Sequence, residues 1–114
     1  MMTHYMGLQT RYFQAIDKGT KDIELRLYDD KRRKIQVGDT IVFTDQTTKQ
    51  VLEKEVAGLL IFPTFYDLLE EVPTKRVSWP SMRRKEMLEI MEQFYPIEKQ
   101  LKTHVVGIVL KDLA

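Results

Sequence analysis

Apolar and polar residues alternate from Asp22 to Tyr28, which is typical of a β-strand with two unlike faces. One face carries the apolar side chains of Ile23, Leu25 and Leu27. The other carries the polar side chains of Asp22, Glu24, Arg26 and Tyr28. Alternate residues of a strand are roughly 6.5–7 Å apart, so Glu24 and Arg26 are predicted to reach each other or one shared ligand.

The same kind of pattern predicts the other elements. A helix is predicted from Leu8 to Asp17 and ended by Gly19. Two more helices are predicted, one capped by Thr64 and stopped by Pro73, the other running from Met82 to Tyr95 with Ser81 as its cap. The expected strands are Lys34–Val37 (short, at an edge), Thr40–Thr44, Val51–Phe62 (bulged at Gly58) and Val105–Leu110. Turns or loops are expected at Asp29–Lys31 and Thr74–Ser81.

Strands joined by hairpins and by helical insertions favour a mixed, mainly antiparallel sheet over βαβ units. We therefore expect an α+β fold, a small curled sheet or pseudo-barrel flanked by helices. With 114 residues, the chain is expected to form a single domain over residues 1–114.

Charge and composition narrow the classes of function. The net charge is +1, which argues against a binder whose affinity comes mainly from phosphate neutralisation. Basic residues nevertheless cluster in two runs, Lys31–Lys34 and Arg83–Lys85. The chain has no cysteine, its only histidines are His4 and His104, and no loop of metal-binding carboxylates is present, so we expect neither a metal nor a cofactor. We find no signal peptide, and the longest apolar run, Gly58–Phe62, is too short to span a membrane, so a cytoplasmic location is expected.

The stretch GTKDIELRLYDDKRRKIQVGDTIVF, residues 19–43, resembles the motif of the ASCH domain family, a branch of the PUA-like superfamily. The residues that match are Gly19, Lys21, Glu24, Arg26, Gly38 and Asp39. The order of the later helices and of the last strand is also similar to that of the family, so the resemblance covers nearly the whole chain. It implies a PUA-like fold and a domain that binds RNA or a nucleotide.

Some proteins that share this motif are amidohydrolases acting on N4-acetylcytidine, and the resemblance implies a catalytic role for Lys21. In those enzymes a Thr occupies the position of Glu24, and a second Glu lies upstream of the last helix. Here Glu24 replaces the Thr, and no Glu is found near Trp79–Met82. The sequence therefore favours binding over this hydrolysis, and whether the protein is an enzyme stays open.

Two interpretations of the polar strand face compete. In one, Glu24 and Arg26 form an ordinary solvated ion pair and Lys21 is a solvated turn residue. In the other, the three line a pocket, where Glu24 accepts from a base and a partly desolvated Lys21 serves as base or nucleophile. Trp79 is predicted either to stack on an unpaired base or to cover the core. The expected phosphate contacts are Lys31, Arg32, Arg33 and Arg83.

Three functions follow from these interpretations. The first is a small ASCH-type domain that binds single-stranded RNA or a nucleotide in a cleft lined by Lys21, Glu24 and Arg26. The second is a hydrolase acting on a modified nucleoside or on RNA, with Lys21 and Glu24 as its catalytic residues. The third is a protein-interaction module that uses the charged helix faces.

Overall fold

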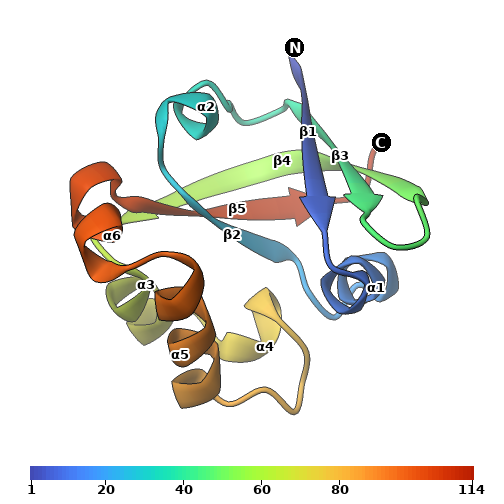
Figure 1. Ribbon diagram of the computed structural model, residues 1–114. Helices are drawn as coiled ribbons and strands as arrows, with labels where there is room; N and C mark the ends of the chain where they lie inside the picture. Colours follow the sequence, from blue (N-terminus) through green and yellow to red (C-terminus); the bar gives the residue numbers. More distant parts are fainter.

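The computed structural model describes all residues from 1 to 114. It contains one curled five-stranded sheet, which forms a half-barrel, and six helices (Figure 1). The strands are β1 (Thr3–Leu8), β2 (Ile23–Leu27), β3 (Thr40–Asp45), β4 (Val51–Phe62) and β5 (Val105–Lys111). The helices are α1 (Thr10–Lys18), α2 (Asp30–Arg33), α3 (Phe65–Glu71), α4 (Thr74–Val77), α5 (Arg84–Phe94) and α6 (Ile97–Thr103).

The order of strands across the sheet is β1-β3-β4-β5-β2. Only the β1–β3 pair is parallel; the other three pairs are antiparallel, which confirms the predicted α+β fold with a mainly antiparallel sheet. β4 is long enough to pair with β3 through its first half and with β5 through its second half. A register shift between Val56 and Gly58 lies where the two halves meet, at the predicted bulge. The bend carries β1 and β2, the two edge strands, toward each other.

Two apolar clusters stabilise the sheet. One lies inside the curl and includes Phe13 and Ile16 of α1 together with Phe43 and Ile108 of the strands. The second lies on the outer face of β2 and β5, where Ile23 and Leu25 pack under α3, α4 and α5. β2 separates the two clusters, so its polar face turns into the curl instead of toward open solvent. None of the helices is long and apolar enough to cross a membrane.

Several helix boundaries follow from local hydrogen bonds. Thr64 caps α3: its Oγ1 accepts from the amide of Asp67, as predicted. The predicted turn at Asp29 is the start of α2, because the Asp29 side chain accepts from the amide of Arg32 and caps a helical turn. The Thr74–Ser81 loop contains the single-turn helix α4.

Two expectations about the elements were wrong, and two elements were missed. Residues 34–37 form no strand, because the amide of Gln36 donates to Asp39 and holds this segment in a turn. α5 begins at Arg84 and not at Met82, since Met82 donates to the carbonyl of Trp79 in a turn that contains Pro80. The sequence reading also missed β1 and α6. Pro96 follows the end of α5 and is at the same time the N-cap residue of α6.

Candidate functional site

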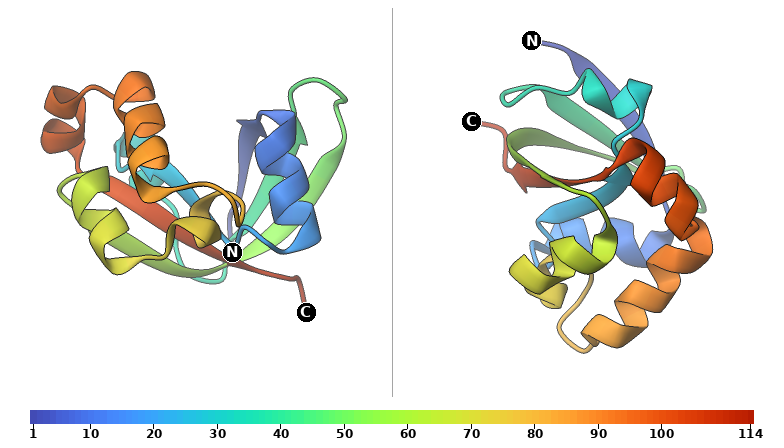
Figure 2. Two further views of the ribbon diagram at one scale, coloured as in Figure 1. Left: turned by 90° about the horizontal axis from the view of Figure 1, so that it is seen from below. Right: turned by 90° about the vertical axis from the view of Figure 1, so that its left-hand side faces the viewer.

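The opening between the edge strands β1 and β2 holds the candidate site. A cleft of about 190 Å³ lies there, lined by residues of α1 and α5. These two helices stand on opposite sides of the gap in Figure 2, left. Its polar floor comes from β2, because Glu24 and Arg26 point into the curl while Leu25 and Ile23 pack on the other side. Its lining residues are Gly7, Leu8, Gln9, Tyr12, Lys21, Glu24, Leu25, Arg26, Gln46, Met87, Met91, Phe94 and Tyr95.

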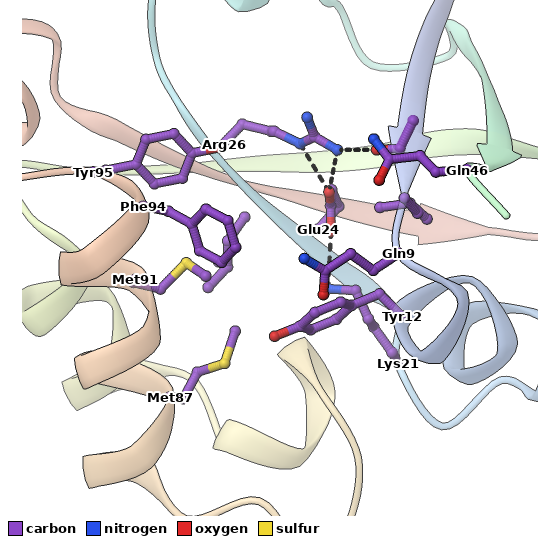
Figure 3. Close-up of a pocket in the computed structure, with 13 residues that line it drawn as sticks. Gln9, Tyr12, Lys21, Glu24, Arg26, Gln46, Met87, Met91, Phe94 and Tyr95 are labelled. Atoms are coloured by element: carbon purple, nitrogen blue, oxygen red, sulfur yellow. Dashed lines mark hydrogen bonds and ion pairs between the residues drawn. The ribbon is translucent and has the colours of Figure 1, made fainter.

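Lys21, Glu24 and Arg26 form a continuous chain of ion pairs on this floor (Figure 3). Lys21 Nζ lies 3.1 Å from Glu24 Oε1, and Arg26 Nη2 lies 2.7 Å from Glu24 Oε2. Arg26 Nε donates to the same oxygen at 2.8 Å. The structure therefore brings together the three residues that the sequence placed in a pocket, and it excludes the interpretation of an ordinary solvated pair, because Lys21 is 2% and Glu24 5% exposed.

The amine of Lys21 is saturated with acceptors. Besides Glu24, it donates to the carbonyl oxygens of Ile23 at 2.5 Å and Val77 at 2.8 Å. Burial lowers the pKa of Lys21, while the neighbouring Glu24 carboxylate acts in the opposite direction. Three acceptors match the three hydrogens of an ammonium group, so the geometry fits a charged Lys21 that holds Glu24 in place.

Glu24 is held ionised by its two cationic neighbours. Burial alone would raise its pKa, but the charges and hydrogen bonds of Lys21 and Arg26 outweigh burial and lower the pKa. A carboxylate offers about four acceptor positions, of which these donors take three. One position, on Oε1, stays available to a donor in the cleft.

Arg26 also joins the two edges of the sheet. Its Nη2 donates to the carbonyl of Gly7 on β1 at 3.0 Å, across the gap that the sheet order leaves open. No intramolecular hydrogen bond uses Nη1, so this nitrogen is free to donate to a ligand.

The walls of the cleft are mostly apolar. Met87, Met91 and Phe94 of α5 face Tyr12 of α1 across the floor (Figure 3). Burial and the nearby Glu24 raise the pKa of Tyr12, against the effect of Arg11, so its phenol stays protonated. Gln9 and Gln46 stand at the rim, and their side-chain amides make no hydrogen bond within the protein. A slot with apolar walls and a few convergent polar groups is the usual form of a small-molecule site.

The other predicted residues lie outside this cleft. Trp79 is half-buried in a neighbouring pocket. Arg32 pairs with Asp29, and Arg33 packs over the Tyr28 ring and donates to the carbonyl of Thr103. Lys31 is exposed on α2, which lies at the top of Figure 1, whereas α5 begins at the bottom. The two basic runs therefore do not form one patch, and Arg83 pairs with Glu86 on its own helix. No group of three His, Asp or Glu side chains is placed to hold a metal ion.

Sequence reasoning missed most of the walls. The wall and rim residues that were not predicted are Gln9, Tyr12, Gln46, Met87, Met91, Phe94 and Tyr95. Met87 and Met91 do belong to the outer cluster, and they also line the cleft. Their helical spacing gave a signal for a buried face but none for which part of that face borders a cavity.

The comparisons with known proteins agree with this architecture. The model of the ASCH domain matches residues 6–111. The protein belongs to the ASCH domain family. The crystal structure of hypothetical protein PH0355 is 36% identical, with a TM-score of 0.86, and the match covers 98% of this chain and 100% of that one. The solution structure of PF0455 from Pyrococcus furiosus is 33% identical, with a TM-score of 0.78 and 98% of each chain covered.

A more distant similarity concerns the fold alone. The ASCH protein from Zymomonas mobilis is 13% identical, with a TM-score of 0.66, and the match covers 96% of this chain and 67% of that one. Among proteins with curated functions, no match is found. The ASCH domain family is generally associated with RNA binding.

Proposed function

We propose that this ASCH domain binds single-stranded RNA, or a nucleotide from it, and holds one unpaired base in the cleft between α1 and α5. The observation that carries the proposal is the chain of ion pairs that joins the buried Lys21 and Glu24 to the half-buried Arg26 at the floor of an apolar slot. Burying the charges of Lys21 and Glu24 is costly, and such groups concentrate at functional sites. The slot is smaller than the roughly 300–1,000 Å³ of pockets for drug-sized ligands, which favours a ligand as small as one base.

The free polar groups match the edge of a base. The available position on Glu24 Oε1 accepts from an amino or imino group, and Arg26 Nη1 donates to a ring nitrogen or carbonyl. Tyr12 and Phe94 supply aromatic surface on opposite sides of the slot. Since the basic runs lie apart, the affinity for RNA comes more from the slot than from phosphate contacts. The salt dependence of binding is therefore shallow.

A titration followed by amide chemical shifts tests this proposal. The labelled protein is titrated with each of the four nucleoside monophosphates and with a short unstructured RNA. We expect shifts at Glu24, Arg26, Tyr12 and Phe94 with at least one base. Shifts confined to Lys31–Lys34 would overturn the base pocket and leave only diffuse electrostatic binding.

Hydrolysis with Lys21 as nucleophile is the second candidate. Burial lowers the pKa of Lys21, and its amine borders the cleft, which favours this role. Its three acceptors oppose it, because a charged ammonium has no free electron pair for attack. The test is incubation of the protein with N4-acetylcytidine, with chromatography of the products. Release of cytidine that is lost in Lys21→Arg would support catalysis; absence of release would reject this activity.

A further inference from the structure

A second pocket continues the cleft along the gap between α1 and α5. It shares Gln9, Tyr12 and Phe94 with the cleft, so these residues form the boundary between two adjoining hollows. The remaining lining residues are Arg11, Trp79, Ser81, Met82, Glu86, Ile90 and Gln93. A ligand that extends from the cleft past Tyr12 and Phe94 therefore reaches the second pocket directly.

Trp79 and Arg11 provide an aromatic ring and a positive charge in this second pocket. The Trp79 ring packs against Tyr12 with centroids 5.4 Å apart, at an interplanar angle of 51°. The guanidinium of Arg11 lies over the Trp79 ring, 3.6 Å from its centroid. Trp79 thus presents a flat aromatic face on which a planar cation already stacks, and planar bases prefer the same kind of surface.

Arg11 is exposed and has no acidic partner in the structure, unlike Arg83, which pairs with Glu86 at 2.6 Å. Its charge is therefore available beside the boundary between the pockets. Because Arg11 and Tyr12 are consecutive residues at the start of α1, the cation lies next to the residue that separates the two hollows. A phosphate that links one base in the cleft to another on Trp79 has to pass this point.

We infer that the cleft and the second pocket together bind two consecutive nucleotides of an unpaired RNA strand, with the second base stacked on Trp79 and Arg11 contacting the linking phosphate. The inference rests on the proposed function, since the first base occupies the cleft. It also specifies the class of ligand, which is a strand of at least two nucleotides and not a free mononucleotide. Arg11 leaves the indole face when the second base takes its place.

The experiment uses the emission of Trp79, the only tryptophan of the chain. The full chain is titrated with UMP, CMP, AMP and GMP, and with the dinucleotides UpU, CpC, ApA and GpG. Fluorescence reports on the second pocket, and amide shifts of Glu24 and Arg26 report on the cleft. For the base that binds best, we expect the dinucleotide to bind about tenfold more tightly than the mononucleotide and to quench Trp79, whereas the mononucleotide leaves the emission unchanged.

Arg11→Ala and the control Lys18→Ala each remove one exposed positive charge from α1. Arg11→Ala is expected to abolish most of the dinucleotide advantage without changing mononucleotide affinity, and Lys18→Ala to change neither. Trp79→Phe should retain part of the advantage. Equal affinities for mono- and dinucleotides, with cleft shifts but unchanged emission, would overturn the second site and leave the proposed function standing. No binding of any probe at either site would overturn both.

Discussion

The guanidinium of Arg26 spans the gap between the two edge strands of the sheet and donates to the carbonyl of Gly7 at 3.0 Å. Arg26 lies on β2 and Gly7 on β1, which occupy opposite ends of the strand order. The same side chain pairs with Glu24. One residue therefore both joins the edges of the half-barrel and lines the cleft, so the position of β1 and the electrostatics of the site depend on each other.

Arg26 is expected to matter more for ligand binding than a basic residue outside the cleft. Arg26→Ala removes a donor from the slot and leaves Glu24 Oε2 without its partner, so RNA affinity should fall by about tenfold or more. Arg33→Ala, on α2, should change affinity only slightly and reduce the salt dependence of binding. Binding of the short RNA by both variants is measured by fluorescence anisotropy at several salt concentrations.

Equal losses in the two variants would contradict a specific pocket. Thermal unfolding of both proteins serves as the control, because Arg26→Ala also removes the contact with Gly7. Arg26→Lys is a useful intermediate: it retains the charge but lacks the planar fork that bonds Glu24 and Gly7 together. It should recover part of the stability and little of the base selectivity.

Lys21 is expected to be essential for stability. Lys21→Ala leaves the carbonyls of Ile23 and Val77 and one oxygen of Glu24 without their buried donor. Removing one member of a buried ion pair typically costs about 3–5 kcal/mol in the free energy of unfolding. Lys18→Ala, at an exposed position of α1, should change it by less than about 0.5 kcal/mol. Urea denaturation compares the variants; a change below about 1 kcal/mol in Lys21→Ala would contradict the structural role.

The strands predicted from alternation or from continuous apolar runs were found because each buries a regular face. β4 was recognised with its bulge since its pattern changes at Gly58, where the register shifts. β1 was missed because it buries too few side chains to give a clear alternating pattern. Only Met6 and Leu8 are buried, and Leu8 also fits the start of the next helix. The prediction of a short edge strand at Lys34–Val37 was wrong. The conformation of that segment is determined by a hydrogen bond to Asp39 and not by its side-chain pattern.

Only those parts of the candidate site whose residues are close together in the chain could be predicted from the sequence. Glu24 and Arg26 are two residues apart on one strand, and Lys21 comes just before it, so spacing and resemblance to the ASCH family both identified them. Gln46 and Phe94 line the cleft only because the sheet curls and α5 packs beside it. Neither proximity can be inferred from a local pattern, because each depends on how distant elements pack.

The protein is expected to lose stability in acid because of Asp39. It accepts hydrogen bonds from His4 Nε2 and from the amides of Gln36 and Met2, and the bond from His4 contributes most to lowering its pKa to about 2. A carboxyl whose pKa is lower in the folded state stabilises that state above the pKa of the unfolded chain, near 4, and this stabilisation is lost as the pH falls toward 2. Urea denaturation between pH 6 and pH 2.5 should show this decline. Asp39→Asn should be less stable at pH 6 and depend less on pH; an equally steep decline would assign the effect to other carboxyls.

Gly107 is predicted to be required for the packing of β2 against the outer cluster. A Cβ at this position of β5 would lie 3.0 Å from Ile23 Cγ2 and 3.3 Å from Leu68 Cδ1, both of which are fully buried. Gly107→Ala should therefore lower the free energy of unfolding by about 1–3 kcal/mol, as overpacking of a dense core usually does. Gly58→Ala is the matched control in β4, because its Cβ would meet only Val109, at 3.6 Å. Thermal and urea unfolding of the two variants decide the question. A Gly107→Ala protein as stable as Gly58→Ala would mean that Ile23 can move, and amide shifts of Glu24 would then show whether the floor of the cleft moves with it.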